Sequence, residues 1–252
     1  MKTKKLVTIL AIASVVFIGA CKKDEVAPPT TNNPTTNPTV IPVQTGQQNP
    51  VQLGGASNMA VLAGASVTNT GATVITGDLG LSPGTSVSGF PPGILNGTMH
   101  INDGIASQAK LDIVAAYNDA AGRTSAEIVT LSGNIGGLTL TPGLYKSTSS
   151  LAISSGDVTL DAQGNANAVF VIQIASSFTT TSGRKVILAG GANPANIFWV
   201  VGSSASFGTT SVLKGTIISY QSITFATGAK LDGRALTRNG NITMAGNTIV
   251  GQ

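Results

Sequence analysis

The sequence predicts a mainly β-protein, built as a β-solenoid of about six coils with one long α-helix at residues 103–121. Three observations predict this fold. Short apolar runs alternate with clusters of Gly, Ser, Asn and Pro along most of the chain, which is typical of short strands joined by turns. A five-residue pattern recurs in the chain, as expected for stacked coils. One stretch alone has the periodicity of a helix.

Residues 1–20 have the composition of a signal peptide, because lysines precede an uncharged apolar stretch that ends in small residues. The uncharged stretch, Leu6 to Ala20, is too short for a comfortable bilayer span. The segment from Ile18 to Cys21 resembles the lipobox of bacterial lipoproteins, which implies lipidation of Cys21; an ordinary secretory signal with an incidental cysteine is the alternative. We expect an outer-membrane lipoprotein exposed at the cell surface, or a secreted protein.

Residues 21–50 are expected to form a tether between the lipidated cysteine and a compact domain at 51–252. Lys22 to Glu25 resembles the surface-export signal of some lipoproteins, and a solvated charge cluster is the alternative. Residues 26–50 hold six of the 11 prolines, interleaved with Thr, Asn and Gln. Such a stretch has little apolar surface to bury and favours an extended chain.

The predicted helix at 103–121 lacks proline and has few β-branched residues. Asn102 or Asp103 can cap its start, and Gly122 can close its end. Its apolar side chains follow a helical spacing, which predicts that one stripe packs on the β-body: Ile105, Ala109, Ile113, Ala116, Tyr117 and Ala120.

The repeated pattern has Ser or Thr first, an apolar residue second, and Thr, Gly or Ala third. Its anchors Phe178, Phe207, Phe225 and Met244 suit successive coils with one strand each on the same face. Because side chains alternate along a strand, the odd positions are expected to point outward. The predicted outward set is Ser66, Thr68, Thr70, Ser150, Ala152, Ser154, Ser177, Thr179, Thr181, Ser206, Gly208, Thr210, Thr224, Ala226, Thr243, Ala245 and Asn247. It contains no charge, whereas surface strands normally carry charged residues for solubility.

The composition argues against nucleic acid as a partner. Charged residues make up only 10%, and the formal charge of +4 falls to +1 without Lys2, Lys4 and Lys5 of the targeting segment. The chain beyond residue 23 has no run of Lys or Arg, so the basic surface that phosphate binding needs is missing.

An enzyme is disfavoured, although solenoids also serve as polysaccharide lyases and hydrolases. Three of the eight acids in 51–252 lie on the predicted helix, and no close pair stands out on the strands. His100 is the only histidine and Cys21 the only cysteine, so a His/Cys zinc site and an intramolecular disulfide are excluded. No cofactor is expected.

A non-catalytic adhesion or carbohydrate-binding module is the alternative function. Sugar platforms usually present aromatic rings, but aromatic residues make up 4% of this chain. Trp199 lies in an apolar run, which favours a place in the core. The combination of a stalk and a solenoid nevertheless suits adhesion.

Residues 53–250 as a whole resemble the microbial ice-binding (antifreeze) proteins. The resemblance rests on the order and spacing of short motifs, among them Asn69–Gly71, Thr76–Gly80, Ser88–Gly93, Thr141–Tyr145, Asn196–Val201 and Gly233–Leu236. It implies a right-handed irregular β-solenoid of triangular cross-section with the helix alongside. It also implies that the outward residues given above bind ice as a flat surface, and that the protein inhibits ice growth and recrystallisation. The expected partners are an ice crystal and, through Cys21, the outer membrane; the expected state is a monomer.

Overall fold

The computed structural model describes residue 37 and residues 40–252. The chain divides into two compact units, Met1–Asn33 and Pro34–Gln252, and only the second lies among the described residues. The predicted signal peptide and the lipidation site at Cys21 therefore lie outside them. No helix in the described part of the chain is long and apolar enough to cross a membrane.

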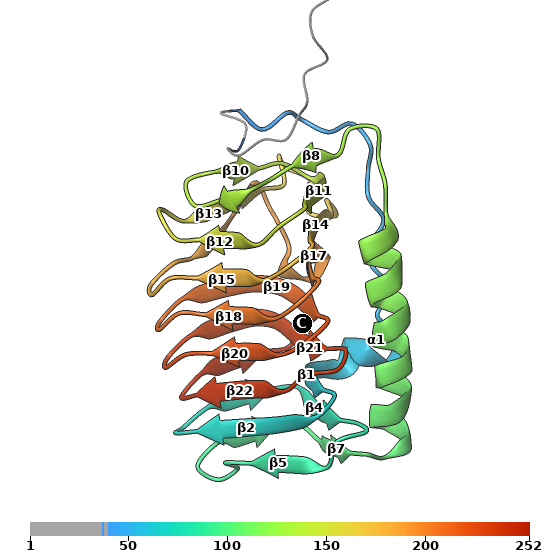
Figure 1. Cartoon of the computed structure of the whole chain (residues 1–252), viewed down its shortest axis with the longest axis vertical. Coiled ribbons are helices and arrows are strands. Elements are labelled where there is room, and N and C mark those ends of the chain that lie inside the picture. The colour runs from blue at the N-terminus through green and yellow to red at the C-terminus, as the bar shows by residue number, and fades with distance from the viewer. Residues whose placement is uncertain (1–36, 38–39) are drawn as a thin grey trace, which may run out of the picture. The chain divides into compact units, whose positions relative to one another are not determined.

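The second unit is mostly β, with parallel sheets and one α-helix, as predicted (Figure 1). Sheet B has eight strands, which in spatial order are β5 (Ser86–Ser88), β2 (Ser66–Thr70), β22 (Ile242–Ala245), β20 (Ile223–Phe225), β18 (Ala205–Phe207), β15 (Phe178–Thr180), β12 (Leu151–Ile153) and β9 (Gly133–Asn134). Its neighbouring strands pair in parallel.

Sheet A has twelve strands and forms much of the rest of the body. Its main path is β6 (Ile94–Asn96), β3 (Val74–Thr76), β23 (Thr248–Val250), β21 (Lys230–Thr237), β19 (Val212–Ser219), β17 (Ile197–Val201), β14 (Phe170–Ile174), β11 (Gly143–Ser147) and β8 (Val129–Thr130). Off this path, β1 (Met59–Ala63) pairs with β21 and β4 (Asp78–Leu81), and β4 pairs with β7 (Met99–Ile101). Sheet C contains β10 (Thr139–Leu140), β13 (Val158–Asp161) and β16 (Val186–Ala189). Two short 3-10 helices, η1 (Gly54–Asn58) and η2 (Pro194–Asn196), complete the elements.

The order of the coils differs from their order in the sequence. Although β2 is near the start of the domain, it pairs with the C-terminal strand β22. After β7 the chain enters α1 (Gly104–Gly122), which runs along the body and brings the chain to β8 at the opposite end (Figure 1). The following coils then return towards β2. The helix is therefore the connection that lets the last coil dock on the first.

The helix begins and ends within one residue of the prediction. Asp103 is the N-cap, and its carboxylate accepts a hydrogen bond from the amide of Ala106 at 2.8 Å. The predicted stripe is wrong at one position, because Ile105 is 56% exposed and Lys110 is buried instead. Lys110 fits this site because its Nζ donates to the backbone carbonyls of Thr237 and Arg238.

A stack of large side chains fills the β-body beneath sheet B. Phe178 stacks on Trp199 with ring centroids 4.7 Å apart, and Phe207 contacts both Phe178 and Phe225. All four are almost completely buried, which confirms the interpretation of Trp199 as a core residue. A second apolar cluster lies between α1 and sheet A. The dense core gives sheet B a rigid backing.

Glycines set the corner inside the two longest strands. Gly215 of β19 lies opposite Gly233 of β21, and its φ of 102° is costly for other residues. A Cβ on Gly233 would lie 2.0 Å from the carbonyl oxygen of Gly215. These strands can therefore bend and continue from one side of the body to the next.

Residues 40–50, which the sequence assigns to the tether, lie against the β-body. The carboxylate of Glu127 accepts hydrogen bonds from the amides of Thr45 and Gly46, both at 2.7 Å. Ile41 packs on the main core, and Gln44 accepts a hydrogen bond from the amide of Leu144 at 2.9 Å. This part of the predicted tether is thus held by the domain.

Candidate functional site

A central row of small side chains runs across the outside of sheet B. Thr68, Thr243, Thr224, Ser206, Thr179 and Ala152 lie opposite one another on successive strands, with Ser88 and Asn134 at the two ends. Neighbouring members are separated by about 4.8 Å, the distance between paired strands. We call these eight residues the central row. The members from Ser88 to Ser206 are exposed, and the other three are half-buried.

The hydroxyl groups of the central row are free to bind water. Within the described part of the chain, no side-chain hydrogen bond is made by Thr68, Thr243, Thr224, Ser206 or Thr179. Thr is stiff at χ1, so its methyl and hydroxyl are held in place without a partner. The row therefore combines fixed methyl groups with unoccupied hydroxyls.

A second row, two residues earlier on each strand, uses its hydroxyls within the protein. The hydroxyls of Ser150 and Ser177 are 2.8 Å apart. The hydroxyl of Ser204 accepts from the amide of Ser222 at 3.3 Å, and that of Ser222 accepts from the amide of Asn241 at 3.1 Å. These serines stabilise the coil corners, and fewer of their hydroxyls are left for water.

The row on the other flank consists mainly of very small residues. Thr70 lies opposite Ala245, and the row continues two residues beyond the central one at Ala226, Gly208, Thr181 and Ser154. About 6.7 Å separates this row from the central one, because alternate residues of a strand point to the same side. Small side chains here leave the central row unobstructed.

One position predicted to point outward, Asn247, is buried, and a second, Thr210, is exposed but lies in a turn outside the three rows. Asn247 is only 1% exposed, and its amide donates to the carbonyls of Ala226 and Ala229 at 2.8 and 3.0 Å. Thr210 lies in the turn after β18 with φ of 58°, and its hydroxyl donates to the carbonyl of Thr209. Both follow the last residue of a short strand, where the chain turns and the alternation no longer holds.

Three of the five-residue repeat segments also pair in a register that differs from the prediction. Phe178 lies opposite Ala205 and not Phe207, and Thr68 rather than Ser66 lies opposite Thr243. The repeat segments that begin at Ser66, Ser150 and Ser177 are thus shifted by two residues relative to those that begin at Ser206, Thr224 and Thr243. A shift of two keeps the same side chains outward, so these residues remain on the surface but belong to other rows. Sequence reasoning missed Ser86, Ser88, Asn134, Ser204, Ser222 and Asn241.

The strands of sheet B contain no ionisable residue. The other two sides of the β-body are either covered or charged. One side is covered by α1. The remaining side carries Lys185 and Lys230, and the Lys214 ammonium lies 2.9 Å from the Asp232 carboxylate. Charged groups hold water in a geometry of their own, so sheet B alone presents a neutral, regular surface.

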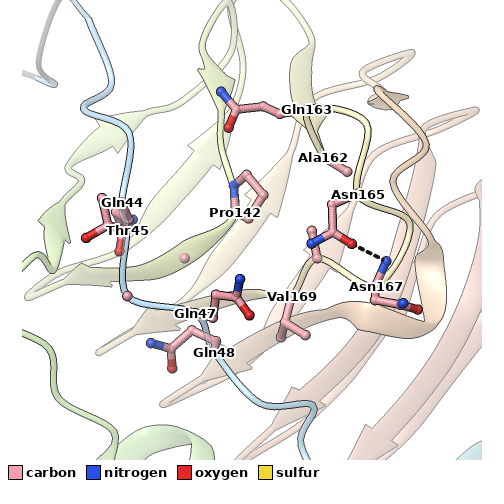
Figure 2. A pocket seen from close by; sticks show the side chains of 13 residues that line it. Gln44, Thr45, Gln47, Gln48, Pro142, Ala162, Gln163, Asn165, Asn167 and Val169 are labelled. Atoms are coloured by element: carbon pink, nitrogen blue, oxygen red, sulfur yellow. Dashed lines mark hydrogen bonds between the residues drawn. The ribbon is translucent and has the colours of Figure 1, made fainter.

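One cavity of the described domain is lined mainly by uncharged polar side chains. The cavity in Figure 2, about 210 Å³ in volume, lies between residues 44–48 and the segment 162–169. Amide side chains dominate its walls, and no acid, histidine or lysine lines it. In the described residues, no three His, Cys, Asp or Glu side chains are grouped as metal ligands are.

His100 has a structural setting at the start of the helix. Its Nδ1 lies 2.8 Å from the Asp103 carboxylate, and its Nε2 lies 3.9 Å from that of Asp78. The hydrogen bonds from the amide of Ala106 and from His100 lower the pKa of Asp103. The imidazole therefore helps to hold the N-cap in place.

Together, the stacked parallel strands, the flanking helix and the uncharged row define a parallel β-protein with an extended, uncharged surface. The chain belongs to the ice-binding-like family, whose model matches residues 61–250. An ice-binding protein from Nostoc sp. (strain HG1) is 46% identical over 198 residues, which are 78% of this chain and 72% of the relative. An ice-binding protein from Flavobacterium frigoris (strain PS1) is 35% identical over 212 residues, 79% of this chain and 75% of the relative.

Solved structures agree with this membership. The crystal structure of an ice-binding protein from an Antarctic biological consortium is 72% identical, with a TM-score of 0.84 over 84% of this chain and 96% of the other. An ice-binding protein from the Antarctic ascomycete Antarctomyces psychrotrophicus is 39% identical, with a TM-score of 0.76 over 81% of this chain and 99% of the other.

Proposed function

We propose that this protein binds ice through the outer surface of sheet B and thereby inhibits ice growth and recrystallisation. The observation that carries the proposal is the central row, in which Thr68, Thr243 and Thr224 lie side by side with hydroxyls that no other described residue engages. Family membership and the ice-binding relatives support the same function.

The mechanism is adsorption. Ice presents a periodic array of water oxygens without charge. The methyl of each Thr orders the water around it, and the hydroxyl anchors that water by a hydrogen bond. Because the side chains are stiff and the core beneath is dense, little conformational entropy is lost when this water layer merges with the crystal. Many weak contacts on one rigid body then release slowly, and ice growing between bound molecules becomes curved, which lowers its local freezing point.

The proposal includes the handedness and cross-section of the solenoid and the oligomeric state. We infer a right-handed irregular solenoid of triangular cross-section, in which about six coils carry the ice-contacting residues from Thr68 to Ala152. We further infer that the protein is a monomer and acts without catalysis, cofactor or metal. Membership of the ice-binding-like family and the relatives named for ice binding support a binding role.

We propose that the domain works at the cell surface as an outer-membrane lipoprotein anchored through Cys21, or as a secreted protein. The signal-like segment 1–20 and the lipobox resemblance support the anchor. Labelling of cells with a radioactive fatty acid tests it: the wild-type chain should be labelled, and Cys21→Ser should not be. A labelled Cys21→Ser chain would contradict the proposal.

The substitution Thr224→Tyr tests the surface. A large ring at the centre of the row should keep the water layer from matching ice, while an exposed side chain leaves folding intact. We expect the concentration needed to inhibit recrystallisation to rise about tenfold, the equivalent of about 1.4 kcal/mol. Thr248→Tyr is the matched control, because Thr248 is also an exposed strand threonine but lies outside sheet B. Equal losses in the two variants, or none in Thr224→Tyr, would place ice binding elsewhere.

A further inference from the structure

A groove on the helix side of the molecule has the features of a ligand site. It lies between the C-terminal half of α1 and strands β14 and β17 of sheet A, and it has a volume of about 360 Å³. This falls within the range of about 300–1,000 Å³ that is usual for small-molecule sites. Its polar walls come from Tyr117, Lys146, Gln173 and Tyr220. None of them belongs to sheet B.

Gln173 provides a hydrogen-bond acceptor that is already fixed in position. Its side chain is more than nine-tenths buried, and its Nε2 donates to the carbonyls of Ala120 at 2.8 Å and Arg123 at 2.9 Å. These two bonds hold the amide plane. Its Oε1 has no partner in the part of the chain that the structure describes. Since Gln173 lines the groove, a ligand hydroxyl that reaches this oxygen can donate a hydrogen bond to it.

Lys146 brings a positive charge to the same groove as Gln173. It lies directly opposite Gln173 on the neighbouring strand β11, and its side chain is exposed. No acidic side chain lines the groove, and Lys146 forms no ion pair with another described residue. The groove therefore favours a ligand with a negative charge close to a hydroxyl group.

Two tyrosines form an aromatic wall. The rings of Tyr117 and Tyr220 are 5.8 Å apart, and the guanidinium of Arg238 lies 5.6 and 5.0 Å from their centroids. This cation holds both rings in place. Burial raises the pKa of Tyr117, so its phenol remains a hydrogen-bond donor at neutral pH. Aromatic rings of this kind can pack against the C–H face of a sugar ring.

We propose that this groove binds acidic polysaccharide, with one uronate-type sugar seated between the tyrosines, Lys146 and Gln173. The carboxylate meets the ammonium of Lys146, a neighbouring hydroxyl donates to Gln173, and the ring packs on the aromatic wall. Because α1 and sheet A form the groove and sheet B carries the central row, the protein can hold a glycan matrix and ice together. The inference does not depend on ice binding.

The full-length protein can be titrated calorimetrically with a trimer of mannuronate and, separately, with neutral cellotriose. We expect saturable binding of the acidic trimer that is tighter than that of the neutral one by up to about fivefold, the upper end of what one exposed ion pair contributes. Lys146→Gln should remove most of this difference, and Lys146→Arg should retain it. Lys230→Gln is the matched control, an exposed lysine outside the groove, and should bind as the wild type does.

Four results would overturn the proposal. These are no saturable binding, equal affinity for the two sugars, an equal loss in Lys230→Gln, or inorganic sulfate competing as well as the trimer, which would indicate a simple anion site. Thermal unfolding of each variant verifies that the exposed substitutions leave the fold intact. Recrystallisation inhibition, measured in parallel, should be unchanged in Lys146→Gln, so that failure of this site is distinguished from failure of ice binding.

Discussion

Thr224 and Thr243 lie directly opposite each other on β20 and β22, and both are exposed with hydroxyls that no other described side chain or backbone group engages. The pair is the centre of the proposed ice-binding surface. It offers a methyl and a hydroxyl at each position, about 4.8 Å apart. The two groups can be separated experimentally because Val keeps the shape and Ser keeps the hydroxyl.

The double substitution of Thr224 and Thr243 to Val should weaken ice affinity about tenfold, and so should the double substitution to Ser. Val loses the anchoring hydroxyl, and Ser loses both the water-ordering methyl and the stiffness at χ1. Partition of labelled protein into a growing ice hemisphere measures the effect. If the Val variant partitions as the wild type does, the hydroxyls are not needed and the methyl groups alone bind ice.

Asn247 should contribute to stability and not to the surface. Its amide joins three backbone groups, the carbonyls of Ala226 and Ala229 and the amide of Ala245. Asn247→Ala removes all three hydrogen bonds of a buried side chain, so we expect a loss of about 2–4 kcal/mol in the free energy of unfolding.

Urea unfolding at neutral pH measures this loss, with Thr243→Ala as the control. Thr243 is exposed and makes no side-chain hydrogen bond among the described residues, so its replacement should change stability by about 0.5 kcal/mol or less. Similar values for the two variants would mean that the network around Asn247 is not needed for folding.

The sequence predicts the orientation of most of this surface, because the alternation of side chains along a strand is a local property. A two-residue shift preserves that alternation, so the sequence could not distinguish Thr68 from Ser66 as the partner of Thr243. The pairing of β2 with β22 depends on where the chain lies after α1, and no local sequence pattern determines that position. The internal bonds of Ser204 and Ser222 depend on neighbouring coils in the same way.

For the helix, the limits could likewise be predicted from local sequence, but the buried stripe could not. Its limits follow from the capping residue Asp103 and from composition, and they are predicted to within one residue. Which stripe faces inward depends on the carbonyls of Thr237 and Arg238 at the end of β21, which draw Lys110 into the interface. Ile105 is consequently exposed.

Lys110 should make stability depend on pH above neutrality. Burial, and secondarily the charge of Arg238, lowers its pKa to about 8 from an ordinary value of 10.5. Between these values the unfolded chain binds more protons than the folded one, so the free energy of unfolding rises with pH. The full shift corresponds to at most about 3 kcal/mol. Near pH 10 the raised pKa values of Tyr117 and Tyr145 begin to act in the opposite direction.

Urea unfolding between pH 7.5 and about 9.5 isolates this effect, because Lys110 titrates there before the tyrosines do. We expect stability to rise across this interval in the wild type and in Lys230→Met, whose lysine is exposed. In Lys110→Met the rise should be absent. A rise of the same size in Lys110→Met would assign it to another group.

Glu127 should control whether residues 44–46 stay on the domain. Hydrogen bonds from the Thr45 hydroxyl, at 2.6 Å, and from the amides of Gly46 and Thr45 hold the pKa of this carboxyl below its ordinary value. The bonds stabilise the attached segment fully at pH values above the ordinary pKa of a glutamate. They are lost as the pH falls through the lowered pKa of Glu127. Hydrogen exchange at the Gly46 amide reports this directly: its protection should be high at pH 6 and decline below about pH 4. Glu127→Ala should remove the protection at both values, whereas Asp232→Ala, which changes an acid on another side of the body, should leave it intact. Protection that persists in Glu127→Ala would show that the packing of Ile41 and the hydrogen bond to Gln44 hold the segment without the carboxylate.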